Sequence, residues 1–170
     1  MPTMEEYARQ TREQRMQRLT RTADELSAAI KGQAEAVLGR RPDAKNWAAN
    51  EIVCHLRDTE EVFGARFDLI LAMDSDPALV AVVWGGEPNA DRVAEERQYL
   101  RNDAMEAVRA FRRRRDENLE LLRKLTPAQW DKGGTNPVRG HRTIDWFLTL
   151  MAWHDDNHLD QLHRALAGQA

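Results

Sequence analysis

The sequence predicts an all-α protein, a four-helix bundle that occupies residues 1–170 as a single domain. Apolar residues recur at spacings of three and four along most of the chain, which is the period of an amphipathic helix, and strand signals are nearly absent. A chain of 170 residues is long enough to bury one core, and 9 glycines and 6 prolines are too few for a collagen-like or disordered chain. Four long helices of this kind make a bundle.

The first two helices are each predicted from an apolar stripe and from their end signals. The first begins at a capping box formed by Thr3 and Glu6 and stops near Gly39 and Pro42. Its stripe contains Met16, Leu19, Ala23, Leu26, Ile30 and Val37. The second helix covers residues 46–73, and its seam contains Ile52, Leu56, Val62, Phe63, Ile70 and Met73.

The third and fourth helices follow the same pattern. The third covers residues 91–125, with inward positions at Leu100, Ala104, Val108, Phe111, Leu119, Leu122 and Leu125. Thr126 and Pro127 then cap a short helical turn that ends at Trp130. A loop rich in glycine and proline precedes the fourth helix, residues 143–166.

Two connections, residues 74–90 and 131–142, are longer than a tight bundle turn. Loops of this length in a compact domain often line or cover a site. The first loop also permits a crossover, so an up-down-down-up order of helices is as admissible as a simple up-and-down order. No internal repeat and no second domain is visible.

Composition and charge exclude several classes of protein. The longest apolar stretches, such as residues 78–84, are far shorter than the roughly 18 residues that span a bilayer, so no membrane helix is expected. Residues 1–15 carry charges where a secretory signal has its apolar core. The single cysteine, Cys54, excludes an intrachain disulfide and favours a cytoplasmic location. The 25 basic and 28 acidic residues give no overall footprint for nucleic acid.

Three histidines fall on the predicted seams of two helices. A heptad frame on the fourth helix places Ile144, Met151, His158 and Ala165 at one core position and Phe147, His154 and Gln161 at the other. Residues four apart lie one above the other, so His154 and His158 can direct ring nitrogens at one point. His55 lies on the seam of the second helix, at the height of His158 if the two helices are antiparallel and of His154 if they are parallel.

These histidines have a structural and a functional interpretation. A lone buried histidine is more often a hydrogen-bonded core residue. Three imidazoles in the seams all need partners, and together they favour a divalent metal site. Three neutral imidazoles leave at least one coordination position open, as in catalytic sites. Imidazole ligands suit Zn, Ni, Co, Cu or Fe better than Mg or Ca; Zn or Ni is favoured, with Fe, Co and Mn as alternatives.

Three neighbours of these histidines are weaker candidates. Asp58 is three residues after His55, and Asp155 is three before His158. Either carboxylate could orient an imidazole as a second-shell group or be a solvated helix charge. Cys54 points about 100° away from His55 around the helix, which favours a small core residue over a ligand or nucleophile.

The basic run 112–115 is interpreted mainly as a solvated helix face, because four consecutive residues spread around the axis. Arg114 or Arg115, and also Arg66, nevertheless approach a seam, where an acidic partner or an anionic cofactor could meet them. Exposed positions are also expected for His141 and His163.

Two segments, residues 47–71 and 122–162, resemble the hallmark regions of the DinB/YfiT-like superfamily of bacterial four-helix-bundle metalloproteins. The resemblance covers nearly the whole chain, including the loop DSDPALVAVVW, and an H-L-x-D pattern continues to Asp58 and an H-x3-H-x2-Q pattern to Gln161. It implies a divalent metal held by His55, His154 and His158.

Relatives of this kind include thiol-dependent transferases and an isomerase, with bacillithiol, mycothiol or glutathione-like cofactors, and the resemblance also suggests a homodimer. It implies a low-molecular-weight thiol that attacks a small electrophile, because a metal-bound thiol is deprotonated at neutral pH. Arg66 or the 112–115 run would then meet the carboxylates of the thiol, and Trp84 and Trp130 would border a pocket under the long loops.

Two alternatives stay open. One is a metal-dependent hydrolase of the same fold, with Asp58 or Asp155 as the base near a metal-bound water. The other is a non-catalytic, stress-related binding module whose basic helices contact nucleic acid or a partner protein; the slightly acidic net charge of −3 argues against nucleic acid.

Overall fold

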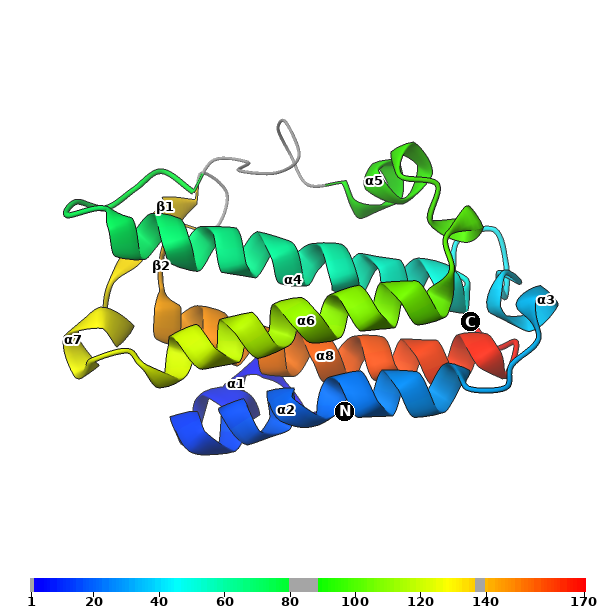
Figure 1. The fold of residues 1–170 in the computed structure, drawn as a ribbon, viewed down its shortest axis with the longest axis horizontal. Coiled ribbons are helices and arrows are strands. Elements are labelled where there is room, and N and C mark those ends of the chain that lie inside the picture. The colour runs from blue at the N-terminus through cyan, green and yellow to red at the C-terminus, as the bar shows by residue number, and fades with distance from the viewer. Residues whose placement is uncertain (1, 80–88, 137–139) are drawn as a thin grey trace.

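A computed structural model describes residues 2–79, 89–136 and 140–170. Within them, four long helices lie side by side along the long axis of the molecule (Figure 1). These are α2 (Arg12–Ile30), α4 (Ala49–Ala72), α6 (Ala104–Arg123) and α8 (Ile144–Leu166). The all-α four-helix bundle predicted from the sequence is therefore confirmed.

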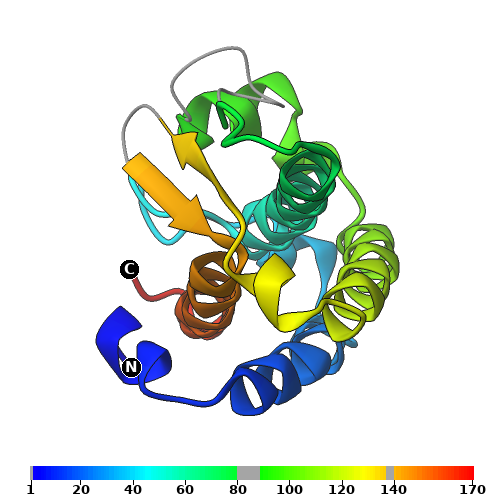
Figure 2. The same cartoon turned by 90° about the vertical axis from the view of Figure 1, so that its left-hand side faces the viewer.

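The helices form a ring in which α2 and α4 stand diagonally opposite, because each of them packs against both α6 and α8 (Figure 2). Helices α4 and α6 run parallel, as do α2 and α8, whereas α4 and α8 are antiparallel (Figure 1). The order is up-down-down-up, one of the two that the sequence allowed. The contacts Arg12–Asp145 and Arg18–Asp156 define the direction of α2 relative to α8. Asn50–Asn102 and Glu60–Asn118 do so for α4 and α6, and His55–His158 and Phe67–Phe147 for α4 and α8.

The prediction of one continuous first helix from Thr3 to near Gly39 is wrong. The chain forms α1 (Met4–Ala8), α2 and α3 (Glu35–Leu38) instead. The capping box of Thr3 is present, but a second one at Thr11 starts a new helix, and Gly32 ends that helix with a left-handed φ of 74°. Local end signals thus override the continuous apolar stripe.

The third predicted helix is also interrupted, into α5 (Ala90–Glu96), a 3-10 turn η1 (Tyr99–Arg101) and α6. Gln98 has a φ of 51°, and Asp103 caps α6 by accepting a hydrogen bond from the backbone N–H of Glu106. The interruption turns Leu100 outward, so this residue is 42% exposed and does not face the core as predicted.

A small antiparallel hairpin, β1 (Gly133–Asn136) with β2 (Gly140–Thr143), lies in and just after the loop 131–142. The sequence did not predict it, because strand signals are nearly absent. It follows α7 (Pro127–Trp130), the short turn expected there. A Cβ at Gly134 would lie 2.6 Å from the Leu79 side chain, so only glycine permits this close packing of the hairpin.

Two hydrophobic clusters fill the bundle, one around Ile52, Phe111 and Leu162, and the other around Phe67, Leu122 and Met151. The buried polar groups of the bundle lie between helices that these clusters hold together. No helix in the described part of the chain is long and apolar enough to cross a membrane.

Candidate metal centre

Three histidines meet between α4 and α8. His55 comes from α4 and is 8% exposed, and His154 and His158 come from α8 and are half-buried. Each histidine offers one ring nitrogen, and these three nitrogens all lie within 4.8 Å of one another. The Nε2 atoms of His55 and His154 are 3.2 Å apart. The structure thus brings together all three histidines that the sequence proposed as ligands; we call them the histidine cluster.

The antiparallel packing of α4 and α8 explains this convergence. His154 and His158 are one turn apart on α8, and His55, in the second turn of α4, faces both, with ring centroids 5.2 and 4.7 Å away. The cluster lies toward the end of the bundle at which α4 begins.

The heptad frame predicted for α8 holds at four of its seven positions. Ile144, Phe147, Met151 and Ala165 are buried as expected, whereas His154, His158 and Gln161 are half-buried. Past Met151 the buried stripe follows Asp155, Leu159 and Leu162 instead. A straight helix drifts by about 20° per heptad relative to a 3.5-residue repeat, so the histidines lie at the edge of the core stripe.

Two aromatic side chains border the histidine cluster. The Trp47 ring lies 4.9 Å from that of His55 and stacks on that of His158 at 6.4 Å. Phe63 meets His154 edge to face at 6.3 Å. The sequence analysis did not single out Trp47 as a site residue; its position just before α4, eight residues before His55, was the available signal.

The surroundings favour neutral imidazoles. Burial, and secondarily the neighbouring His158, lowers the pKa of His55 to about 3, and burial also lowers the pKa of His158. Nδ1 of His158 lies 2.8 Å from Oε1 of Gln161, which can only accept, so Nδ1–H donates and the Nε2 lone pair is left for another partner. Neutral imidazole is the form that binds metals.

The donor set fits a divalent metal of the zinc type. Two imidazole nitrogens bound to one tetrahedral ion at about 2.1 Å lie about 3.4 Å apart, close to the 3.2 Å between His55 and His154. Among the residues that the structure describes, no carboxylate or thiol joins the three imidazoles. A purely imidazole set suits Zn or Ni better than Mg or Ca.

The two carboxylates proposed as second-shell groups are engaged elsewhere. Asp58 accepts hydrogen bonds from the Tyr99 hydroxyl at 2.5 Å and from Arg57 and Arg97 at 2.7 and 2.9 Å. It thereby ties the segment that contains η1 to α4. Asp155 accepts hydrogen bonds from Arg115 and from the hydroxyl of Thr22. Both carboxylates are therefore held as ion pairs.

The two described candidates for cofactor binding, Arg66 and Trp130, make their cation–π contacts with partners other than the three histidines. Arg66 lies over the Phe147 ring at 5.6 Å, beyond Phe63 on α4. Trp130 is buried under Arg12 and lines a cavity of about 610 Å³ between the start of α2 and the end of α6, to which no histidine contributes. Trp84 lies outside the described residues.

The remaining candidates lie as the sequence suggested. Cys54 is fully buried, and burial raises the pKa of its thiol to about 11. His141 and His163 are exposed. In the basic run, Arg115 is buried and meets acidic partners, Glu60 and Asp155, whereas Arg112, Arg113 and Arg114 are half-buried or exposed.

The fold and the histidine cluster together place the chain in a class: four-helix-bundle proteins with a candidate metal centre between two antiparallel helices. The family model of the DinB superfamily matches residues 18–162, and the chain belongs to this superfamily. Among solved structures, it is similar to YfiT from Bacillus subtilis, described as a probable metal-dependent hydrolase with an unusual four-helix bundle topology. The TM-score is 0.80 at 20% sequence identity, over 94% of this chain and 89% of that one, which shows a shared fold. The search of curated proteins found no match.

Proposed function

We propose that this protein is a divalent-metal-dependent enzyme that activates a low-molecular-weight thiol for attack on a small electrophile. The observation that carries the proposal is the convergence of three imidazoles, from His55, His154 and His158, on one point between two helices. Zn or Ni is the favoured metal, and Fe, Co or Mn are alternatives.

The residues of the chain have separate parts in this proposal. The three histidines would hold the metal, and Gln161 fixes the tautomer of His158. The Trp47 and Phe63 rings pack against the rings of His55 and His154. When bound, a divalent metal lowers the pKa of a coordinated thiol or water, which makes a nucleophile at neutral pH.

Two observations bear on the nucleophile. Burial raises the pKa of the Cys54 thiol to about 11, so an attacking sulfur would have to come from a separate molecule. Activation of water by a protein base would need a carboxylate at the cluster, and the two candidates, Asp58 and Asp155, are bound to arginines.

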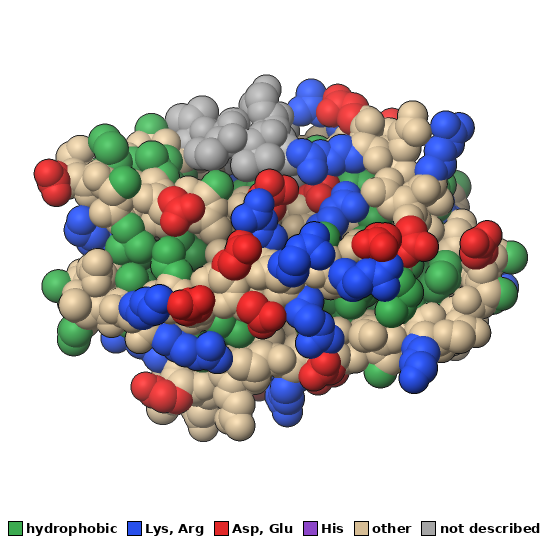
Figure 3. All heavy atoms as spheres, in the orientation of Figure 1, with side chains coloured by type: hydrophobic (Ala, Val, Ile, Leu, Met, Phe, Trp, Pro, Cys, Tyr) green, Lys and Arg blue, Asp and Glu red, His purple; other side chains and the backbone are tan. Residues whose placement is uncertain are grey.

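Metal-dependent hydrolysis is the second candidate, because YfiT, which has the same fold, is described as a probable metal-dependent hydrolase. A nucleic-acid-binding module is disfavoured: basic and acidic side chains intermingle on the face in Figure 3, and Arg112 and Arg114 pair with acidic residues. Phosphate binding needs a patch of one sign.

Tag-free protein, loaded with Zn or Ni, tests the proposal in two steps. Elemental analysis of the wild type and of His154→Ala should show metal only in the wild type. The loaded protein is then screened with bacillithiol, mycothiol, glutathione and coenzyme A against chlorodinitrobenzene-type and bimane-type acceptors. Turnover that needs both the thiol and His154 supports the proposal. Ester or amide cleavage without any thiol supports metal-dependent hydrolysis instead. The absence of turnover with every thiol contradicts the proposed thiol transfer.

A homodimer is proposed as the oligomeric state in the cytoplasm. A bundle of this size with amphipathic outer helices has surface to offer to a second copy. Light scattering at high micromolar concentration should give twice the chain mass of 19.6 kDa, and a monomer mass would refute the dimer.

A further inference from the structure

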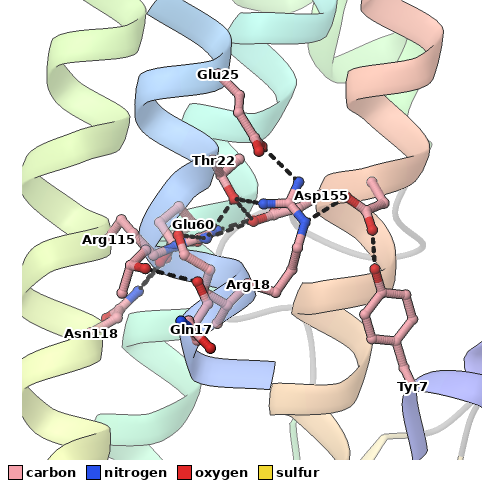
Figure 4. A network of polar contacts seen from close by, with 12 residues as sticks. Tyr7, Gln17, Arg18, Thr22, Glu25, Glu60, Arg115, Asn118 and Asp155 are labelled. Atoms are coloured by element: carbon pink, nitrogen blue, oxygen red, sulfur yellow. Dashed lines mark hydrogen bonds and ion pairs between the residues drawn. The ribbon is translucent and has the colours of Figure 1, made fainter. Parts of the chain in front are cut away.

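The α8 segment between the two histidines contains two aspartates, Asp155 and Asp156, that reach different partners. Figure 4 labels Asp155 together with Arg115 and Glu60. Asp155 is 1% exposed, and its two oxygens accept hydrogen bonds from both terminal nitrogens of Arg115, at 2.6 and 3.1 Å. Asp156 is half-buried and accepts hydrogen bonds from Arg18 and from the hydroxyl of Tyr7. One carboxylate thus points to the centre of the bundle and the other to the α1 and α2 side.

Arg115 connects Asp155 to α4. One of its terminal nitrogens donates to Glu60 at 2.7 Å, and the other donates to the carbonyl oxygen of Leu19 on α2 at 3.1 Å. Asn118, one turn further along α6, donates to the second oxygen of Glu60 at 2.7 Å. Groups from all four long helices therefore meet at one level, and we call this set the charge network: Thr22, Glu60, Arg115, Asn118 and Asp155.

Stability alone is a weak reason for this network. Arg115, Glu60 and Asp155 are each at most 2% exposed, and two carboxylates face one guanidinium. Desolvation of buried ions costs as much as their attraction returns, and apolar residues of similar volume are often as stabilising. What such a network does provide is a fixed arrangement of the helices that carry it, since each hydrogen bond holds only at one geometry.

That arrangement bears directly on the histidine cluster. Asp155 lies between His154 and His158 on α8, about 100° and 60° from them around the axis. Glu60 is on α4, five residues after His55. Because one guanidinium bonds both carboxylates, α4 and α8 cannot rotate independently about their axes.

The geometry points to Arg115 as a positioning residue for the histidine cluster. Held between Glu60 and Asp155, it fixes the rotation of α4 and α8 at which the three imidazoles converge. This inference rests on the proposed metal binding but on neither proposed reaction.

The test compares two aspartate variants of the full chain, Asp155→Asn and Asp156→Asn. Each removes one carboxylate from between the same two histidines, but only the first breaks the link to Arg115. Zinc affinity is measured by competition with a chromophoric chelator, and the cobalt form is compared by its visible absorption. We expect Asp155→Asn to weaken zinc binding by about 10- to 100-fold and to change the cobalt spectrum, while Asp156→Asn stays within about threefold.

A third variant, Arg115→Lys, keeps the buried positive charge but lacks the planar fork that bonds two carboxylates at once. We expect Arg115→Lys to bind zinc about tenfold more weakly than the wild type. It replaces Asp155→Asn as the test variant if Asp155→Asn does not fold. Circular dichroism of the metal-free variants separates loss of fold from loss of affinity. Wild-type affinity and cobalt spectrum in a folded Asp155→Asn or Arg115→Lys would overturn the inference alone. A folded wild type that binds no metal would instead overturn the proposed function, and this inference with it.

Discussion

Two polar clusters lie inside the same bundle, and they differ in how their groups complement one another. In the charge network, opposite charges face each other, since Arg115 lies between Glu60 and Asp155. In the histidine cluster, three groups of one kind converge, and neutral imidazoles at 3.2 Å can share at most one proton between each pair. A set of like acceptors aimed at one point is completed by a cation, whereas a set of opposite charges is complete by itself. The first arrangement indicates binding, and the second indicates support.

Removal of the central cation of the charge network should produce the largest effect. Arg115→Met leaves two buried carboxylates without their counter-charge, which should lower the free energy of unfolding by about 3–5 kcal/mol. Urea denaturation of the metal-free protein measures this loss. Arg114→Met, the exposed neighbour, should stay within about 0.5 kcal/mol, and equal losses in the two variants would contradict a special role for Arg115.

Removal of one member of the histidine cluster should act on metal binding instead of on the fold. His55→Ala should lower zinc affinity by at least about 100-fold, because a ligand loss exceeds the loss expected for an outer residue. Chelator competition measures the affinity, with His163→Ala, on the exposed side of α8, as the matched control. If both variants bind zinc equally, the cluster is not the metal site.

Acid should destabilise the metal-free protein through His55. Above pH 6.5 this residue is neutral in both the folded and the unfolded chain, so it adds no pH dependence. Between pH 6.5 and about 3 the unfolded chain binds a proton that the buried ring excludes, so the free energy of unfolding falls by about 1.4 kcal/mol per pH unit, or about 2 kcal/mol by pH 5.

Chemical denaturation of the wild type and of His55→Gln at pH 5 and pH 7 measures the loss in the free energy of unfolding that is due to His55. The variant should lack this loss, because glutamine does not titrate, and the difference between the two chains cancels the titration of groups that do not contact His55. A wild type that loses no more stability than His55→Gln between these pH values would contradict the low pKa of His55.

The smallest effect is expected at Asp58, another buried carboxylate on α4. Asp58→Asn should lower the free energy of unfolding by about 1–2 kcal/mol, because its bonds to Arg97 and Tyr99 weaken. Hydrogen exchange should increase in η1, while zinc affinity stays within about threefold. A tenfold loss of affinity would show that Asp58 does orient His55, contrary to its contacts in the structure.

The sequence by itself predicted the parts of the molecule that depend on local pattern. The observed ends of α4 and α8 lie within three residues of the predicted bounds. Their apolar stripes are long, residues 74–77 stop α4, and Thr143 caps α8. The pair His154 and His158 needed only the geometry of one helix. The breaks at Gly32 and Gln98 were missed because an apolar stripe persists through a change of backbone direction.

Only the tertiary structure decided what depends on how the helices are paired. Up-down-down-up order was one of two allowed topologies, and it is the antiparallel packing of α4 and α8 that sets His55 against both His154 and His158. Periodicity could bring Arg115 near a seam but could not choose its partners, Glu60 and Asp155, which are contributed by two other helices. A helix can be predicted from residues three and four positions apart in the sequence. Contacts between distant segments depend on the rotation and direction of whole helices, which no local pattern encodes.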